Sequence, residues 1–111
     1  RIRDKSKIEV IMPFVDIVEG FNSRNLKKRD NQQAFKLAQN YQKPVLWGCD
    51  AHFAHELKNA IVEIPPFNLN PQDFLYAILK AKPLRQKRSF LGFFQSIFKK
   101  YLLFKPFVLI F

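Results

Sequence analysis

The sequence predicts an α/β fold, because short apolar runs that fit strands alternate along the chain with segments of helical periodicity. The chain has 111 residues, the size of one domain, and it contains 48% hydrophobic and 25% charged residues. That composition is globular, and we find neither a repeat nor a low-complexity stretch. The prediction is therefore one α/β unit rather than a disordered, collagen-like or multidomain chain.

Three apolar runs are the candidate strands. Residues 14–21 precede a polar loop, residues 45–47 follow Pro44, and residues 61–64 are closed by Pro65 and Pro66. Runs this short that end in turn-forming residues are typical of strands. We expect these three segments to supply the sheet.

Helices are predicted between and after the strands. The first begins at Asp30 or Asn31 and ends at residue 42, with one apolar face made of Ala34, Leu37, Ala38 and Tyr41. Residues 53–59 fit a turn or a short helix. Asn70 caps a further helix that begins at Pro71, and we expect Pro83 to end it. Ser89 is the candidate cap of a last helix, whose aromatic face holds Phe90, Phe93, Phe94, Ile97, Phe98 and Tyr101.

The positive charge is concentrated at the end of the chain. The formal net charge is +10, all nine acidic residues lie at or before Asp73, and residues 74–111 hold eight Lys and Arg. We call residues 71–111 the basic aromatic tail. Lysines interrupt it too often for a membrane-spanning helix. We expect its aromatic face to pack on the rest of the protein, with a lipid or nucleotide surface as the alternative.

The cysteine count and the first residue indicate the compartment and the extent of the domain. The single cysteine, Cys49, cannot form an internal disulfide, which favours a reducing compartment, and we expect the cytoplasm. The chain starts at Arg1 rather than Met, which fits a piece of a longer protein. We expect residues 1–111 to be a single domain or the C-terminal fragment of a larger one.

The strongest chemical signal lies where the second predicted strand ends, in the segment Gly-Cys-Asp-Ala-His at residues 48–52. Side chains two apart on an extended strand point to the same face, so Asp50 and His52 can present a carboxylate and an imidazole to one metal ion. Gly48 leaves that face open. In α/β folds, active sites lie at the carboxyl ends of strands. A capping Asp and a half-exposed His remain the alternative interpretation.

The neighbouring segments sharpen this interpretation. A Glu-Gly-Phe-Asn segment at residues 19–22 precedes a helix, then the Gly-Cys-Asp-Ala-His-Phe segment and Glu56-Leu57. This order resembles the C-terminal part of the PHP (polymerase and histidinol phosphatase) superfamily of metal-dependent phosphoesterases, and residues 14–64 bear the motifs. The resemblance implies the C-terminal portion of a distorted β/α barrel, with Asp50 and His52 as ligands of divalent manganese, zinc, iron or magnesium.

The sequence also departs from the family pattern. Cys49 stands where the family usually has Ser, and Lys58 where Gly is common. The early His-x-His or His-x-Asp pair and the middle histidines of the family have no counterpart, since the only histidines are His52 and His55. Either the remainder of the PHP domain supplies the missing ligands, or the chain is a degenerate homologue. We expect the isolated fragment to be inactive.

Other residues are weaker candidates. Glu19 and Asn22 could contact substrate or support the ligands, although a strand-terminal Asn is as often a turn residue. Arg24 could bind a phosphate or simply be solvated. For His55 we favour a surface position over a further ligand, and for Cys49 an inert thiol over a nucleophile.

Two functions from different classes follow. The first is hydrolysis of phosphate esters by the whole protein, acting on a phosphorylated small molecule or a nucleic acid, with nucleotides and oligonucleotides favoured by the basic tail. The alternative is a non-catalytic basic module that binds nucleic acid or an anionic membrane surface.

Overall fold

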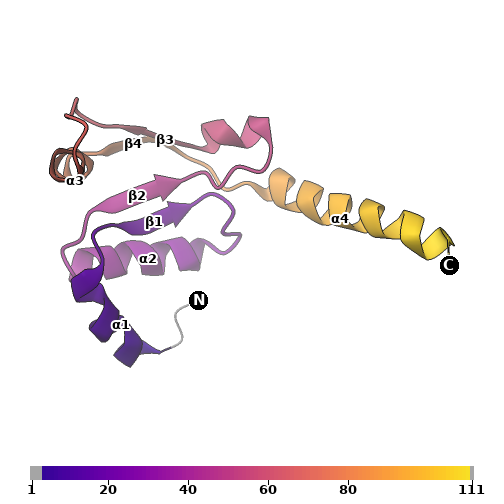
Figure 1. Ribbon diagram of the computed structural model, residues 1–111, viewed down its shortest axis with the longest axis horizontal. Coiled ribbons are helices and arrows are strands. Elements are labelled where there is room, and N and C mark those ends of the chain that lie inside the picture. The colour runs from indigo at the N-terminus through magenta and orange to yellow at the C-terminus, as the bar shows by residue number, and fades with distance from the viewer. Residues whose placement is uncertain (1–3, 111) are drawn as a thin grey trace.

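The computed structural model describes residues 4–110, with side chains described through Lys100, and it confirms the mixed α/β class (Figure 1). Short 3-10 turns, labelled η, separate some of the regular elements. In chain order the elements are α1 (Lys5–Ile11), η1 (Met12–Phe14), β1 (Val18–Asn22), α2 (Lys28–Asn40), β2 (Val45–Gly48), η2 (Ala54–Asn59), β3 (Ala60–Glu63), α3 (Pro71–Leu79), β4 (Lys82–Gln86) and α4 (Phe90–Ile110).

The first sheet is a single β-α-β unit. Strands β1 and β2 are parallel, with Val18 opposite Val45 and Asn22 opposite Gly48, and α2 connects them along one side of the sheet (Figure 1). The predicted apolar face of this helix is confirmed, since Ala38 is fully buried and the other three residues are half-buried. This unit brings the carboxyl ends of β1 and β2 to one edge.

The second sheet is the antiparallel pair of β3 and β4, which α3 connects at one end (Figure 1). Ala77 and Ile78 of α3 are buried, and the other buried apolar residues among those described are Met12, Phe21 and Ala38. The two sheets contain two strands each. Because so few apolar side chains are buried, buried polar contacts contribute a large part of the packing between these elements.

The limits of the first strand and helix differ from the prediction. We expected a strand over residues 14–21, but β1 begins at Val18, and Phe14 is 85% exposed at the end of the turn η1, which contains Pro13. Proline fixes a helical φ, which suits this turn better than a strand. Helix α2 begins at Lys28 and ends at Asn40, because Gln42 adopts a positive φ of 53° and turns the chain towards Pro44.

Pro83 does not end a helix as predicted. Helix α3 already ends at Leu79, and Pro83 lies within β4, a strand the sequence did not predict. A proline is compatible with this place because β4 is an edge strand, where a missing N–H donor costs little. Helix α1 was also not predicted; it is short and exposed, and Asp4 caps it by accepting from the Ser6 amide at 3.1 Å.

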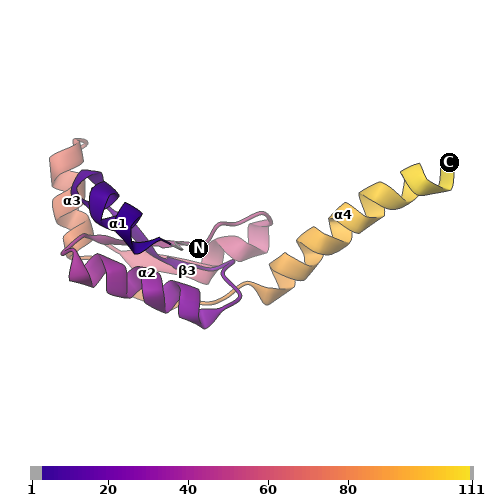
Figure 2. The same cartoon turned by 90° about the horizontal axis from the view of Figure 1, so that it is seen from below.

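Helix α4 confirms the predicted last helix but not its packing. It projects away from both sheets (Figures 1 and 2), and Phe94 and Phe98 are 62% and 63% exposed. Phe93 is half-buried, so among the described side chains the face is only partly covered, and its packing on the rest of the protein stays a prediction. The aromatic side chains from Tyr101 onward lie outside the described residues. Of the described helices, none is apolar over a length that could cross a bilayer.

Candidate functional site

The carboxyl ends of β1 and β2 bring three polar side chains together. The side-chain nitrogen of Asn22, Nδ2, donates to Glu19 Oε2 and to Asp50 Oδ2, each at 3.3 Å. Asn22 thus bridges a carboxylate from β1 and a carboxylate that follows β2. Glu19, Asn22 and Asp50 were all predicted as candidates, and the parallel pairing of the two strands explains why they meet.

Gly48 makes room for this arrangement. A Cβ atom added at Gly48 would overlap the carboxylate of Glu19. Any larger residue would therefore push Glu19 away from the end of β2. The open face predicted at Gly48 is occupied by the Glu19 side chain.

The Asp50–His52 pair forms for a different reason than expected. Strand β2 ends at Gly48 and Asp50 has a φ of 46°, so the two residues do not lie on an extended strand. The turn nevertheless brings His52 Nδ1 to 2.9 Å from the Asp50 carbonyl oxygen and to 3.9 Å from Asp50 Oδ1. An Nδ1–H that donates to a backbone carbonyl leaves the Nε2 lone pair free, as in histidines that bind metals.

The donor set fits a metal ion only in part. Asp50 and His52 offer a carboxylate oxygen and an imidazole nitrogen, the types that bind manganese, zinc, iron and magnesium in mixed sites. Their side chains are 48% and 54% exposed, so both can be reached. Within residues 4–110, however, no three His, Cys, Asp or Glu side chains are grouped closely enough to hold a metal. Further ligands would have to come from other parts of the protein.

Glu56 holds the segment that carries His52. Its carboxylate is fully buried and accepts from the backbone amides of His52 at 2.7 Å and Phe53 at 3.0 Å. It also accepts from the Ser89 hydroxyl and pairs with Arg24 Nη1 at 2.9 Å. The Glu56 carboxylate thus links the turn that carries His52 to Arg24 in the loop after β1 and to Ser89 just before α4.

These contacts change the acidity of Glu56. Burial alone would raise the pKa of Glu56, but the hydrogen bonds from Ser89, His52 and Phe53 and the charge of Arg24 together lower it from 4.5 to about 2. The carboxylate is therefore charged at neutral pH. Its four partners hold the charged Glu56 side chain in one orientation.

Arg24 takes part in this network. Its side chain is 11% exposed, and Nη2 donates to Ser96 Oγ of α4 at 2.7 Å. The interpretation of Arg24 as a solvated residue is wrong, and both terminal nitrogens contact Glu56 and α4 rather than the Asp50 group. The sequence singled out Glu56 only as part of a motif and did not predict this pair.

Asn31 is a further residue that the sequence did not single out as part of the site. It is buried in the first turns of α2, where its Oδ1 accepts from the Asn22 backbone amide at 3.0 Å and its Nδ2 donates to the Asn22 carbonyl at 3.1 Å. Oδ1 also accepts from Asn25 Nδ2 at 2.8 Å. Asn31 therefore fixes the backbone of the residue that bridges Glu19 and Asp50.

Comparisons with known proteins identify the family of the chain. A family model described as PHP-associated matches residues 28–83, which include α2, β2 and the Asp50–His52 turn. The chain belongs to the PHP-associated family. The predicted resemblance to the C-terminal part of the PHP superfamily is thereby confirmed.

One curated relative of this PHP-associated chain is an uncharacterized protein of Methanocaldococcus jannaschii. The two are 33% identical over 93 residues, which cover 74% of this chain and 39% of the relative. The chain thus spans well under half the length of that relative. No solved structure matches the chain significantly.

Two other candidate residues of the PHP-associated chain are neighbours of Asp50 and His52 in sequence. His55 is exposed and its ring stacks on Phe53 with 5.8 Å between centroids, which agrees with a surface histidine. Cys49 is a half-buried free thiol.

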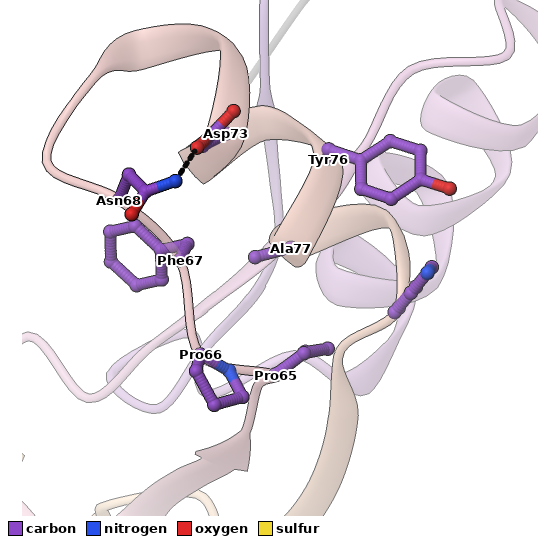
Figure 3. Close-up of a pocket in the computed structure, with 8 residues that line it drawn as sticks. Pro65, Pro66, Phe67, Asn68, Asp73, Tyr76 and Ala77 are labelled. Atoms are coloured by element: carbon purple, nitrogen blue, oxygen red, sulfur yellow. Dashed lines mark hydrogen bonds between the residues drawn. The ribbon is translucent and has the colours of Figure 1, made fainter.

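A hollow of about 400 Å³ lies between the loop after β3 and α3 (Figure 3). Asn68 and Asp73 close one side of it through a hydrogen bond of 2.7 Å, and Lys80 covers the ring of Tyr76 at 4.4 Å. None of its lining residues belongs to the Glu19–Asp50 group. We assign no function to this hollow.

Gly92 offers a direct test of the contact between Glu56 and α4. A Cβ atom at this buried position would overlap the Glu56 carboxylate and the Ser89 hydroxyl. Gly92→Ala should therefore destabilise the full-length protein by about 1–3 kcal/mol in urea unfolding, although alanine favours helices over glycine by about 1 kcal/mol. Gln95→Ala, on an exposed position of α4, is the control and should change stability by less than about 0.5 kcal/mol. A more stable Gly92→Ala protein would contradict the contact.

Proposed function

We propose that this chain is the C-terminal part of a PHP-type barrel that hydrolyses phosphate esters with divalent metal ions. In this proposal residues 14–64 carry the motifs, residues 71–111 form the basic aromatic tail, and the remainder of the PHP domain supplies the missing ligands. The match of residues 28–83 to a PHP-associated family supports the PHP context, and the 39% coverage of the relative supports a longer parent protein. The single cysteine favours the cytoplasm as the compartment.

One observation carries the proposal. The Asp50–His52 turn lies at the carboxyl ends of two parallel strands, and a hydrogen bond to the Asp50 carbonyl orients the His52 ring with Nε2 free. A ligand whose second nitrogen is held in this way is already oriented before the metal arrives. The Asp50 carboxylate and His52 Nε2 are the two ligands that we assign to this chain.

The remaining residues have supporting roles. When bound, divalent ions supply a nucleophilic water near neutral pH and neutralise phosphoryl oxygens. Asn22 keeps Asp50 Oδ2 engaged, which leaves Oδ1 for the metal. Glu19 of β1 accepts from the same Asn22 side chain, and its carboxylate lies beside Gly48 at the end of β2. There it can accept a hydrogen bond from substrate or solvent. Arg24 and Glu56 position the turn and do not contact substrate.

The substrate class follows from charge. A protein segment with a net charge of +10 attracts anions, and phosphorylated small molecules, nucleotides and oligonucleotides are the candidates. The two assigned ligands are compatible with manganese, zinc, iron or magnesium.

Metal content and turnover of the full-length protein test the proposal. The wild type should contain bound divalent metal by elemental analysis and should hydrolyse an aryl phosphate in a chelator-sensitive reaction. Asp50→Ala and His52→Ala should each lose metal and lower turnover by about 100-fold or more, because ligand loss disrupts the metal cluster.

His55→Ala is the matched control, since His55 is an exposed histidine three residues away. It should keep both metal and turnover. Wild-type metal content in a folded Asp50→Ala protein would remove the basis for the site. A metal-free, inactive wild type that still binds anions would instead support the non-catalytic basic module.

A further inference from the structure

Helix α4 is oriented with its apolar side outward. The side that faces the body holds small polar residues and the half-buried Phe93. Ser89 just before the helix and Gly92 are buried against Glu56, and Ser96 accepts from Arg24. The opposite side follows the spacing i, i+1, i+4, i+7, i+8 of a single helical stripe. Its members, all 45–63% exposed, are Phe90, Leu91, Phe94, Ile97 and Phe98. We call these five residues the outer stripe.

The buried ion pair holds α4 in this orientation. Rotating the helix to bury the outer stripe would separate Ser89 from Glu56 and Ser96 from Arg24, which would expose or orphan a buried charge. The network therefore keeps the outer stripe uncovered by the described residues of this chain. Helix α4 projects from the rest of the chain (Figure 2). An exposed apolar patch on such a helix is typical of an interaction site.

The charged residues of α4 and of the segment before it indicate what the outer stripe binds. Lys99 and Lys100 are exposed on α4, Arg85 and Lys87 are exposed just before it, and no acidic residue follows Asp73. A second copy of this helix would bring like charges together with no carboxylate to pair them. Nucleic acid would use the cations, but it gains little from aliphatic residues such as Leu91 and Ile97.

We propose that the outer stripe of α4 docks on an anionic lipid membrane surface. The apolar side chains enter the boundary between headgroups and acyl chains, and the long Lys side chains reach the anionic headgroups. The helix lies in the interface and does not span the bilayer. This inference does not depend on the proposed phosphoesterase activity.

Vesicle flotation of the full-length protein tests the proposal. The protein should bind vesicles of phosphatidylcholine with about 30% phosphatidylserine, and binding to phosphatidylcholine alone should be much weaker. Phe94→Gln/Phe98→Gln should weaken binding about 10-fold or more. Lys99→Gln/Lys100→Gln should also weaken it about 10-fold at low salt, with a smaller effect at high salt. Leu69→Gln is the control, because Leu69 is 99% exposed in a loop outside α4, and it should bind like the wild type.

Other occupants give distinct results, each of which overturns the proposal. A large loss of melting temperature in Phe94→Gln/Phe98→Gln would show that another part of the protein covers the outer stripe. A dimer that this variant abolishes would identify a second copy. Binding to oligonucleotides without binding to anionic vesicles would identify nucleic acid. Phosphate hydrolysis in Phe94→Gln/Phe98→Gln should be unchanged, which shows that the outer stripe and the metal site are tested independently.

Discussion

Replacing Glu56 by alanine is expected to lower the free energy of unfolding of the full-length protein by about 3–5 kcal/mol. The variant leaves the Arg24 guanidinium in a buried place without its carboxylate and removes the acceptor of the His52 and Phe53 amides. Removing one partner of a buried ion pair has a cost of this size because the other charge remains desolvated. Urea unfolding at neutral pH measures the loss.

Two controls make this prediction specific to the buried pair. Glu9→Ala removes an exposed carboxylate and should change stability by less than about 0.5 kcal/mol. Arg24→Met/Glu56→Leu leaves no unpaired charge and should recover part of the loss. A Glu56→Ala protein as stable as Glu9→Ala would contradict the buried pair.

The pH dependence of the same variant identifies the carboxylate. The pKa of Glu56 is lowered from 4.5 to about 2 in the folded protein, so its contribution to stability is complete above pH 4.5 and is lost as the pH falls towards 2. The difference in stability between wild type and Glu56→Ala should therefore shrink over that interval. A difference that stays constant down to pH 2 would mean that packing, and not the charge, accounts for the loss.

Local patterns were sufficient to predict much of the secondary structure. The Asn70-Pro71 start predicted the first residue of α3, and the Ala34–Tyr41 spacing predicted the buried face of α2. The strand β4 was missed because its residues are all exposed and include Pro83, so neither alternation nor hydrophobicity marks it. Its stability comes from pairing with β3, a contact between distant segments that no local pattern contains.

The candidate site was predictable at the level of residues but not of contacts. Spacing and resemblance selected Glu19, Asn22, Asp50 and His52, and the structure brings the first three into hydrogen-bond contact. The left-handed backbone of Asp50 was not predictable, since only the turn after β2 imposes it. The orientation of α4 depends on one buried polar network, whereas its sequence alone shows a hydrophobic helix that should be covered.

Asn31→Ala is expected to be the most damaging change outside the ion pair, with a loss of about 2–4 kcal/mol of stability and about 10-fold weaker metal retention in the full-length protein. Alanine would leave the Asn22 backbone amide and carbonyl without their buried partners, and each unsatisfied group costs about 1–3 kcal/mol. Loosening Asn22 then frees Asp50 Oδ2, because the Asn22 side chain bridges the two carboxylates. Urea unfolding and competition with a metal-binding dye measure the two effects.

Two further variants separate the hydrogen bonds of Asn31 from a general effect on α2. Gln33→Ala changes an exposed residue of the same helix and should leave both stability and metal retention unchanged. Asn31→Asp keeps the oxygen that accepts from Asn22 and Asn25 but places a second oxygen against the Asn22 carbonyl, so it should also be destabilised. Normal metal retention in a destabilised Asn31→Ala protein would show that Asn22 does not position Asp50, and the role of Asn31 would then be confined to joining α2 to the end of β1.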